Sequence, residues 1–144
     1  MVRKATLADA ATVTALSLKL WSENDYEEMF REFQDYLCSS ECALFLAFDG
    51  EVPVGFAQCQ LRHDYVEGTE TSPVGYLEGI FVSDGYRRQG IAGKLLSACE
   101  NWAREMGCTE FASDCELTNR DSLAFHLNVG FTEANRIICF TKPL

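Results

Sequence analysis

Hydrophobic residues recur along this chain with two different periods, and the periods predict which segments are helices and which are strands. A spacing of three to four residues marks one face of a helix. It appears in four segments: one through Val13, Leu16, Leu20 and Trp21, one over residues 25–37, one over 90–106 and a short one over 121–128. Thr6 or Asp9 is available to cap the first helix, and Gly107 to end the third.

Short apolar runs bounded by turn residues predict the strands. They cover residues 2–5, 43–48, 52–61, 76–82 and 109–114, followed by a final hairpin that opens at Gly130 and runs to residue 141. The order βααβββαβαββ indicates an α/β fold with a mixed, mostly antiparallel central sheet flanked by helices. The length of 144 residues suits one domain over residues 1–144.

Composition excludes several classes of protein. With 47% hydrophobic and 24% charged residues the chain is typical of globular proteins. It has neither the run of roughly 18 apolar residues that a membrane span requires nor the pattern of a secretory signal, so we expect it in the cytoplasm. The seven cysteines contain no C-x2-C pair, which favours small buried side chains in a reducing compartment over a metal site.

Charge narrows the choice of partner. The 12 basic and 22 acidic residues give a net charge of −10, which disfavours nucleic acid and anionic membranes. Residues 1–75 carry 5 basic and 13 acidic side chains, and residues 23–41 hold seven acidic side chains beside Arg31 alone. This run is either the solvated face of a helix or a surface that attracts a cationic substrate.

The segment between the 76–82 strand and the 90–106 helix indicates an anion-binding loop. A helix N-terminus has backbone N–H groups without intrahelical partners, and small residues let a phosphate approach them. The residues available are Arg87, Arg88, Gln89, Gly90, Ile91, Ala92, Gly93 and Lys94. Neither a Walker loop nor a G-x-G-x-x-G fingerprint is present.

Arg87, Gly90 and Ala92 form R-x-x-G-x-A, which resembles the pyrophosphate-binding signature of the GNAT superfamily of acetyltransferases. The alternative is a helix start whose glycines allow tight packing. The resemblance implies acetyl-CoA as cosubstrate, with its pantetheine arm along Ile80, Phe81 and Val82. It also implies a cofactor contact from Asn119, which fits an ordinary helix cap equally well.

Glu78 is unexpected in the middle of an apolar strand, because an unpaired buried carboxylate costs several kcal/mol. It therefore faces a wet cleft, where it could accept a proton from an ammonium group, or it pairs internally with Arg62 or Arg136. Gly79 beside it suggests a β-bulge or a close backbone approach.

Asp114 and His126 are two further candidates. Asp114 ends a strand, where it either binds a substrate ammonium or caps a turn. His126 stands in H-x-x-x-G-F, where the GNAT pattern usually has a tyrosine that protonates the departing thiolate. A histidine can also donate there, although a lone helical histidine is more often structural.

Several segments more specifically resemble the aminoglycoside 6'-N-acetyltransferases, and together they span nearly the whole chain. They are Leu20-Trp21, residues 62–66 with Gly68, Ser72-Pro73, residues 76–82 and residues 112–114. The resemblance implies that Trp21, Tyr65, Glu78 and Asp114 contact an aminoglycoside and that the protein forms a homodimer through its C-terminal strands. One departure is Asn135, which precedes Arg136 where relatives often have an acidic residue.

The sequence therefore predicts an enzyme that transfers acetyl from acetyl-CoA directly to the 6'-amine of an aminoglycoside. Glu78 positions and helps deprotonate the amine, His126 assists the leaving thiolate, and backbone N–H groups near Ile80 and Phe81 polarise the thioester carbonyl. One alternative is the same chemistry on another cationic amine, a polyamine or a peptide. A second is a non-catalytic acyl-CoA sensor.

Overall fold

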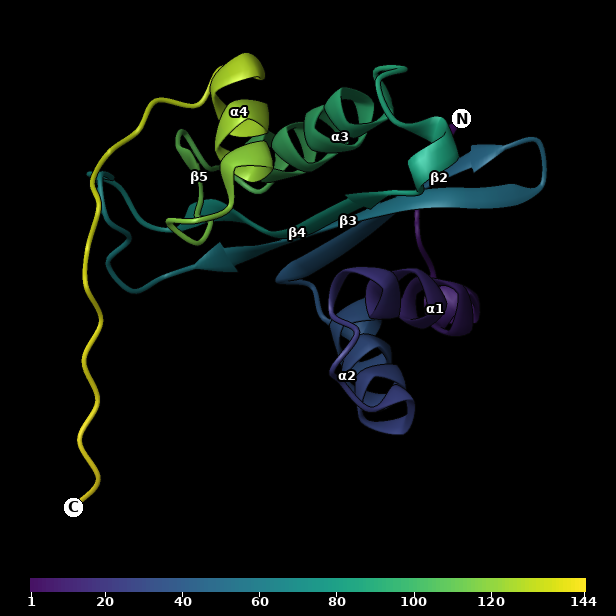
Figure 1. The fold of residues 1–144 in the computed structure, drawn as a ribbon, viewed down its shortest axis with the longest axis horizontal. Helices are drawn as coiled ribbons and strands as arrows, with labels where there is room; N and C mark the ends of the chain where they lie inside the picture. The colour runs from purple at the N-terminus through teal and green to yellow at the C-terminus, as the bar shows by residue number, and fades with distance from the viewer.

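The computed structural model describes all of residues 1–144, and its centre is one five-stranded sheet (Figure 1). The strands are β1 (Val2–Lys4), β2 (Cys42–Asp49), β3 (Val52–Arg62), β4 (Val74–Val82) and β5 (Phe111–Ser113), which lie in this order across the sheet. β1 to β4 pair antiparallel, whereas β5 lies parallel to β4.

Helices cover both faces of the sheet. In Figure 1, α1 (Ala10–Leu20) and α2 (Tyr26–Cys38) lie below it, and α3 (Ile91–Glu105) and α4 (Arg120–Asn128) lie above it. Short 3-10 segments, Leu7–Asp9 and Asp84–Tyr86, precede α1 and follow β4. None of the helices is long and apolar enough to cross a membrane.

The two larger hydrophobic cores follow from the alternation of side chains along the strands. On β2, Leu44 and Leu46 pack with α1 and α2, whereas Phe45 between them packs toward α3. The core on the α3 side contains Leu95 and Trp102, which the helical spacing of residues 90–106 predicted. β3 and β4 are thereby fixed from both sides.

The sequence prediction is confirmed for the four helices and for the strands at β1 to β4. It is wrong for the hairpin at residues 130–141, which form no strand and leave the body of the protein in an extended path (Figure 1). Ile137, Ile138 and Phe140 are 67%, 80% and 87% exposed, because no neighbouring strand in this single chain pairs with the segment. β5 is also shorter than the predicted 109–114.

The seven cysteines differ in burial. Cys59, Cys99 and Cys108 are buried as expected and Cys42 is partly buried, but Cys38, Cys115 and Cys139 are exposed. The prediction of small buried side chains therefore holds for only part of the set. All seven are free thiols. No three of the His, Cys, Asp and Glu side chains gather closely enough to hold a metal ion.

Candidate active site

The loop before α3 presents an open set of backbone donors. Gly90 caps the helix with φ +78°, a left-handed conformation that favours glycine. The Lys94 N–H bonds the Gly90 carbonyl at 3.1 Å, which leaves the N–H groups of residues 91–93 free of intrahelical partners. A Cβ at Gly90 or Gly93 would meet no atom within 4 Å. The loop therefore has room for an anion at the positive end of α3.

The two arginines of this loop differ in their contacts. Arg87 turns back onto the protein: its Nε donates to the Val82 carbonyl at 2.9 Å, and its Nη1 lies 3.0 Å from Asp84. The side chains of Arg88 and Lys94 are exposed and make no hydrogen bond or ion pair. Of the residues predicted to bind pyrophosphate, Arg88 and Lys94 are therefore the free cations, and Arg87 shapes the loop.

A gap opens between β4 and β5. β4 and β5 pair only from Gly75 opposite Phe111 to Leu77 opposite Ser113. Beyond Leu77, β4 continues to Val82 paired with β3 alone. The Ser83 N–H bonds β3, so by the alternation of an antiparallel ladder the N–H groups of Ile80 and Val82 face the gap. The unpaired edge of β4 runs about 17 Å from Val82 back to Leu77 and Ser113. This path suits an extended ligand with amide groups.

Glu78 is the extra residue of a β-bulge, as the neighbouring glycine suggested. Gln58 pairs with Gly79 and Cys59 with Leu77, so Glu78 has no partner on β3. Trp21 explains the glycine, because a Cβ at position 79 would lie 2.6 Å from the indole. The bulge turns the Glu78 carboxylate toward the α1 and α2 side of the sheet.

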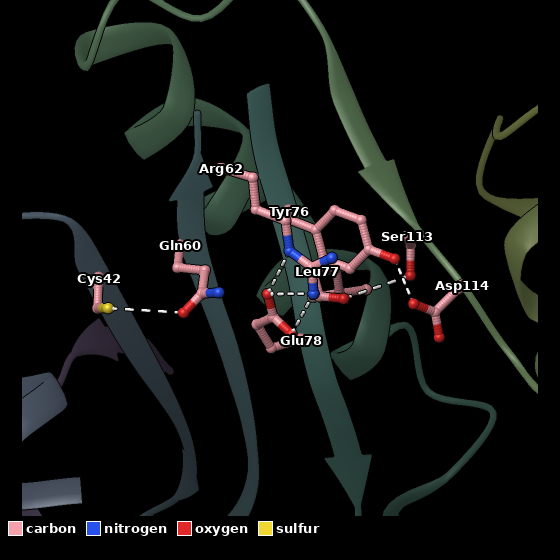
Figure 2. Close-up of polar contacts among 8 residues, drawn as sticks. All are labelled: Cys42, Gln60, Arg62, Tyr76, Leu77, Glu78, Ser113 and Asp114. Carbon is pink, nitrogen blue, oxygen red and sulfur yellow. Dashed lines mark hydrogen bonds and ion pairs between the residues drawn. The ribbon is translucent and has the colours of Figure 1, made fainter. Parts of the chain in front are cut away.

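The Glu78 carboxylate is also paired, as the second interpretation of this residue expected. Arg62 donates to Oε1 from Nε and Nη2 at 3.0 and 2.9 Å, and to Oε2 from Nη2 at 3.0 Å (Figure 2). Arg136, the other candidate partner, bonds Glu133 instead. A carboxylate has about four lone-pair directions, so these three contacts leave one open on Oε2.

Arg62 and Tyr76 together connect Glu78 to Asp114. Its guanidinium carbon lies 3.5 Å from the centroid of the Tyr76 ring, and the Tyr76 hydroxyl donates to Asp114 (Figure 2). Burial, followed by the bond to the Asp114 carboxylate, raises the pKa of Tyr76 well above its usual value. Tyr76 therefore stays a neutral donor that holds Asp114 in place at the protein surface.

A hollow of about 200 Å³ lies between α2 and the bulge of β4. Its walls include Trp21, Met29, Phe33 and Tyr36, and two carboxylates, Glu78 and Glu32, reach it. Sequence analysis did not single out Glu32 or Tyr36, although they share a face of α2 with Met29 and Phe33 at helical spacing. The acidic run thus contributes at least one carboxylate to a cavity, while most of it is solvated.

Two of the expected substrate residues lie outside this hollow. Tyr65 is 76% exposed in the segment between β3 and β4, and Asp114 is exposed just beyond β5. A larger hollow of about 360 Å³, lined by α3 and the start of β5, contains none of the predicted residues.

His126 is held on both ring nitrogens. Nδ1 lies 2.6 Å from the Ser122 carbonyl oxygen, and Nε2 lies 2.8 Å from the Ser113 hydroxyl. A carbonyl only accepts, so Nδ1 carries the proton; in the neutral ring Nε2 then accepts from Ser113. Phe125 and Phe131 pack against the ring at 5.6 and 5.0 Å between centroids. Ser113, like Glu32 and Tyr36, was given no role on the basis of the sequence.

Asn119 caps α4, with its Oδ1 accepting from the Ser122 N–H at 3.1 Å. The capping interpretation of this residue is therefore correct. A contact to a cofactor through the remaining amide group stays a prediction.

Comparison with known proteins identifies the class to which this arrangement belongs. Residues 10–131 match the model of the acetyltransferase (GNAT) family, and the chain belongs to that family. Within it, the chain belongs to the aminoglycoside 6'-N-acetyltransferases, as its relatives show. It is 44% identical to aminoglycoside N(6')-acetyltransferase type 1 of Stenotrophomonas maltophilia, over 99% of this chain and 93% of the relative. It is 40% identical to the enzyme of that name from Serratia marcescens, over 90% of each.

Solved structures agree. AAC(6')-Iy in complex with a bisubstrate analogue, CoA-S-monomethyl-acetylneamine, superposes with a TM-score of 0.96 at 33% identity and covers 100% of this chain and 98% of its own. AAC(6')-Ih from Acinetobacter baumannii gives 0.94 at 34% identity, with coverage of 100% and 98%. The resemblances to both the superfamily and the subfamily are confirmed.

Proposed function

We propose that this protein acetylates the 6'-amine of aminoglycosides with acetyl-CoA as the acetyl donor. The observation that carries the proposal is the meeting of two sites at the bulge of β4. The open strand edge and the α3 loop lie on one side of Glu78, and an acidic, aromatic hollow lies on the other.

Acetyl-CoA, when bound, supplies the acetyl group as a thioester. The residues that fit it are the free N–H groups of residues 91–93 with Arg88 and Lys94 for the pyrophosphate, and the edge of β4 for the pantetheine arm. The N–H groups of Ile80 and Val82 face the gap, where a donor can stabilise charge on a carbonyl oxygen.

The hollow suits an amine that is charged before it reacts. Glu32 and Glu78 provide the negative charge, and Trp21 and Tyr36 provide flat apolar walls. The free lone pair on Glu78 Oε2 can orient an ammonium group and take its proton, directly or through water. Asp114, held by Tyr76, offers a second carboxylate for another ammonium of the same scaffold.

A thiol-release assay with acetyl-CoA tests this proposal. We expect turnover with aminoglycosides that have a 6'-amine, little with those that have a 6'-hydroxyl, and little with linear polyamines or peptides. Preferential acetylation of spermidine-like amines would support N-acetyl transfer but contradict an aminoglycoside as the substrate. No thiol release with any amine would favour the acyl-CoA sensor.

We propose further that the protein is a cytoplasmic homodimer in which the C-terminal segment adds to the partner. Three features support the assembly: the large apolar side chains of residues 137–140 are exposed, β5 is a short sheet edge, and a hollow of about 360 Å³ lies beside that edge. The seven free thiols suit a reducing compartment.

We expect sedimentation of the wild-type protein at micromolar concentration to give about twice the mass of one chain. Ile138→Asp combined with Phe140→Asp should shift the protein toward monomer, because two buried apolar side chains contribute roughly 3–6 kcal/mol per segment. Leu117→Asp, at an equally exposed apolar side chain of another loop, is the matched control and should leave the mass unchanged. A wild-type monomer would refute the assembly.

A further inference from the structure

His126 cannot meet a ligand directly through either ring nitrogen. Nδ1 is engaged by the Ser122 carbonyl, Nε2 by Ser113, and two aromatic rings hold the plane of the imidazole. Any proton that leaves Nε2 therefore passes first to the Ser113 oxygen.

Ser113 lies where such a proton is needed. It is the last residue of β5 and pairs with Leu77, the last residue of β4 before the two strands separate. It thus stands at the closed end of the gap whose open end is the α3 loop. The reacting end of an extended donor laid along β4 from that loop would arrive at Ser113.

We propose that Ser113 is a catalytic residue that relays a proton from His126 to the sulfur of the leaving thiolate. The inference rests on the proposed acetyl transfer. Neutral His126 accepts from the Ser113 hydroxyl. When Nε2 takes up a proton, this hydrogen bond reverses, because Nε2 becomes a donor and the serine oxygen an acceptor. The hydroxyl hydrogen then has only the Leu77 carbonyl, at 3.4 Å, as a protein acceptor.

The transfer balances without another reactant. As the carbon–sulfur bond breaks, sulfur takes the electron pair and the Ser113 hydroxyl proton, and the serine oxygen takes the Nε2 proton of the imidazolium. His126 is left neutral, with Nδ1 still bonded to the Ser122 carbonyl. It regains its proton when solvent protonates the Ser113 oxygen and the serine hydroxyl proton passes back to Nε2. The proton lost by the amine leaves separately, through Glu78 or water.

Calorimetry with coenzyme A and desulfo-coenzyme A tests the contact without turnover. Wild-type protein should bind coenzyme A several-fold more tightly than the desulfo analogue. Ser113→Ala should abolish that difference and leave the affinity for the desulfo analogue unchanged. Ser113→Thr, which keeps a hydroxyl, should restore it, and Ser97→Ala on the exposed face of α3 should change neither affinity. A difference that persists in Ser113→Ala would overturn the relay.

Steady-state turnover is the second test of the role of Ser113. Ser113→Ala should lower kcat by about 100-fold, the lower end of the range for general acids, with KM for acetyl-CoA nearly constant. Ser113→Thr should recover most of it. Acetyl attached to Ser113 by mass spectrometry would overturn the relay in favour of a serine nucleophile, as would an unchanged kcat in Ser113→Ala. These results are distinct from failure of the proposed function, in which the wild type acetylates no aminoglycoside.

Discussion

Replacing Glu78 by glutamine is expected to lower kcat for aminoglycosides by about 10²–10⁴-fold, the range for a lost proton acceptor. Glutamine keeps the shape of the side chain but cannot take the proton of the amine, and it leaves the guanidinium of Arg62 without a charged partner. KM for acetyl-CoA should change little, because the α3 loop lies at the other end of the β4 edge. Steady-state kinetics at saturating acetyl-CoA measures the effect.

Two control variants distinguish the loss of a proton acceptor at Glu78 from the loss of one negative charge. Glu41 is exposed and its carboxylate contacts His63 at 2.7 Å, so Glu41→Gln removes a paired carboxylate outside the hollow and should leave kcat unchanged. Asp114→Asn should instead weaken aminoglycoside binding by about 1.5–3 kcal/mol, the scale of a charged hydrogen bond, with a smaller effect on kcat. If Glu78→Gln stays within about threefold of wild type, the carboxylate is only part of the Arg62 network.

Replacing Gly93 by glutamate should weaken binding of coenzyme A by more than about 100-fold while the fold becomes no less stable. Gly93 is in the first turn of α3, has ordinary helical backbone angles and leaves its Cβ position empty. Glutamate favours a helix over glycine by roughly 0.5–1 kcal/mol, and its charge suits the N-terminus. That same charge would occupy the place of the pyrophosphate, whose charged hydrogen bonds contribute about 1.5–3 kcal/mol each.

Calorimetry and thermal melting on the same sample check both halves of this expectation. Ser97→Glu places the same charge one turn farther along α3 on an exposed residue, and its effect on affinity should be small. An unchanged affinity of Gly93→Glu for coenzyme A would show that the pyrophosphate does not bind at this loop. A lowered melting temperature in Gly93→Glu would contradict the account of the helix start.

Local chemistry allowed much of the site to be predicted from the sequence. The bulge at Glu78 could be anticipated because a carboxylate and a glycine interrupt an apolar strand, and the α3 loop because glycines and arginines precede a helical repeat. Periodicity located the four helices and most strands, since burial of one face requires the same spacing wherever it occurs. These features depend on residues that are neighbours along the chain.

Contacts between distant segments were decided only by the tertiary structure. Arg62 or Arg136 could each have paired with Glu78, and the side-by-side placement of β3 and β4 selected Arg62. The contact between Ser113 and His126 could be recognised only from the packing of α4 against the end of β5, because no periodicity in the sequence links the two residues. The segment at residues 130–141 has the composition of a strand but no partner in one chain. A strand needs hydrogen-bonding neighbours, which its own residues cannot specify.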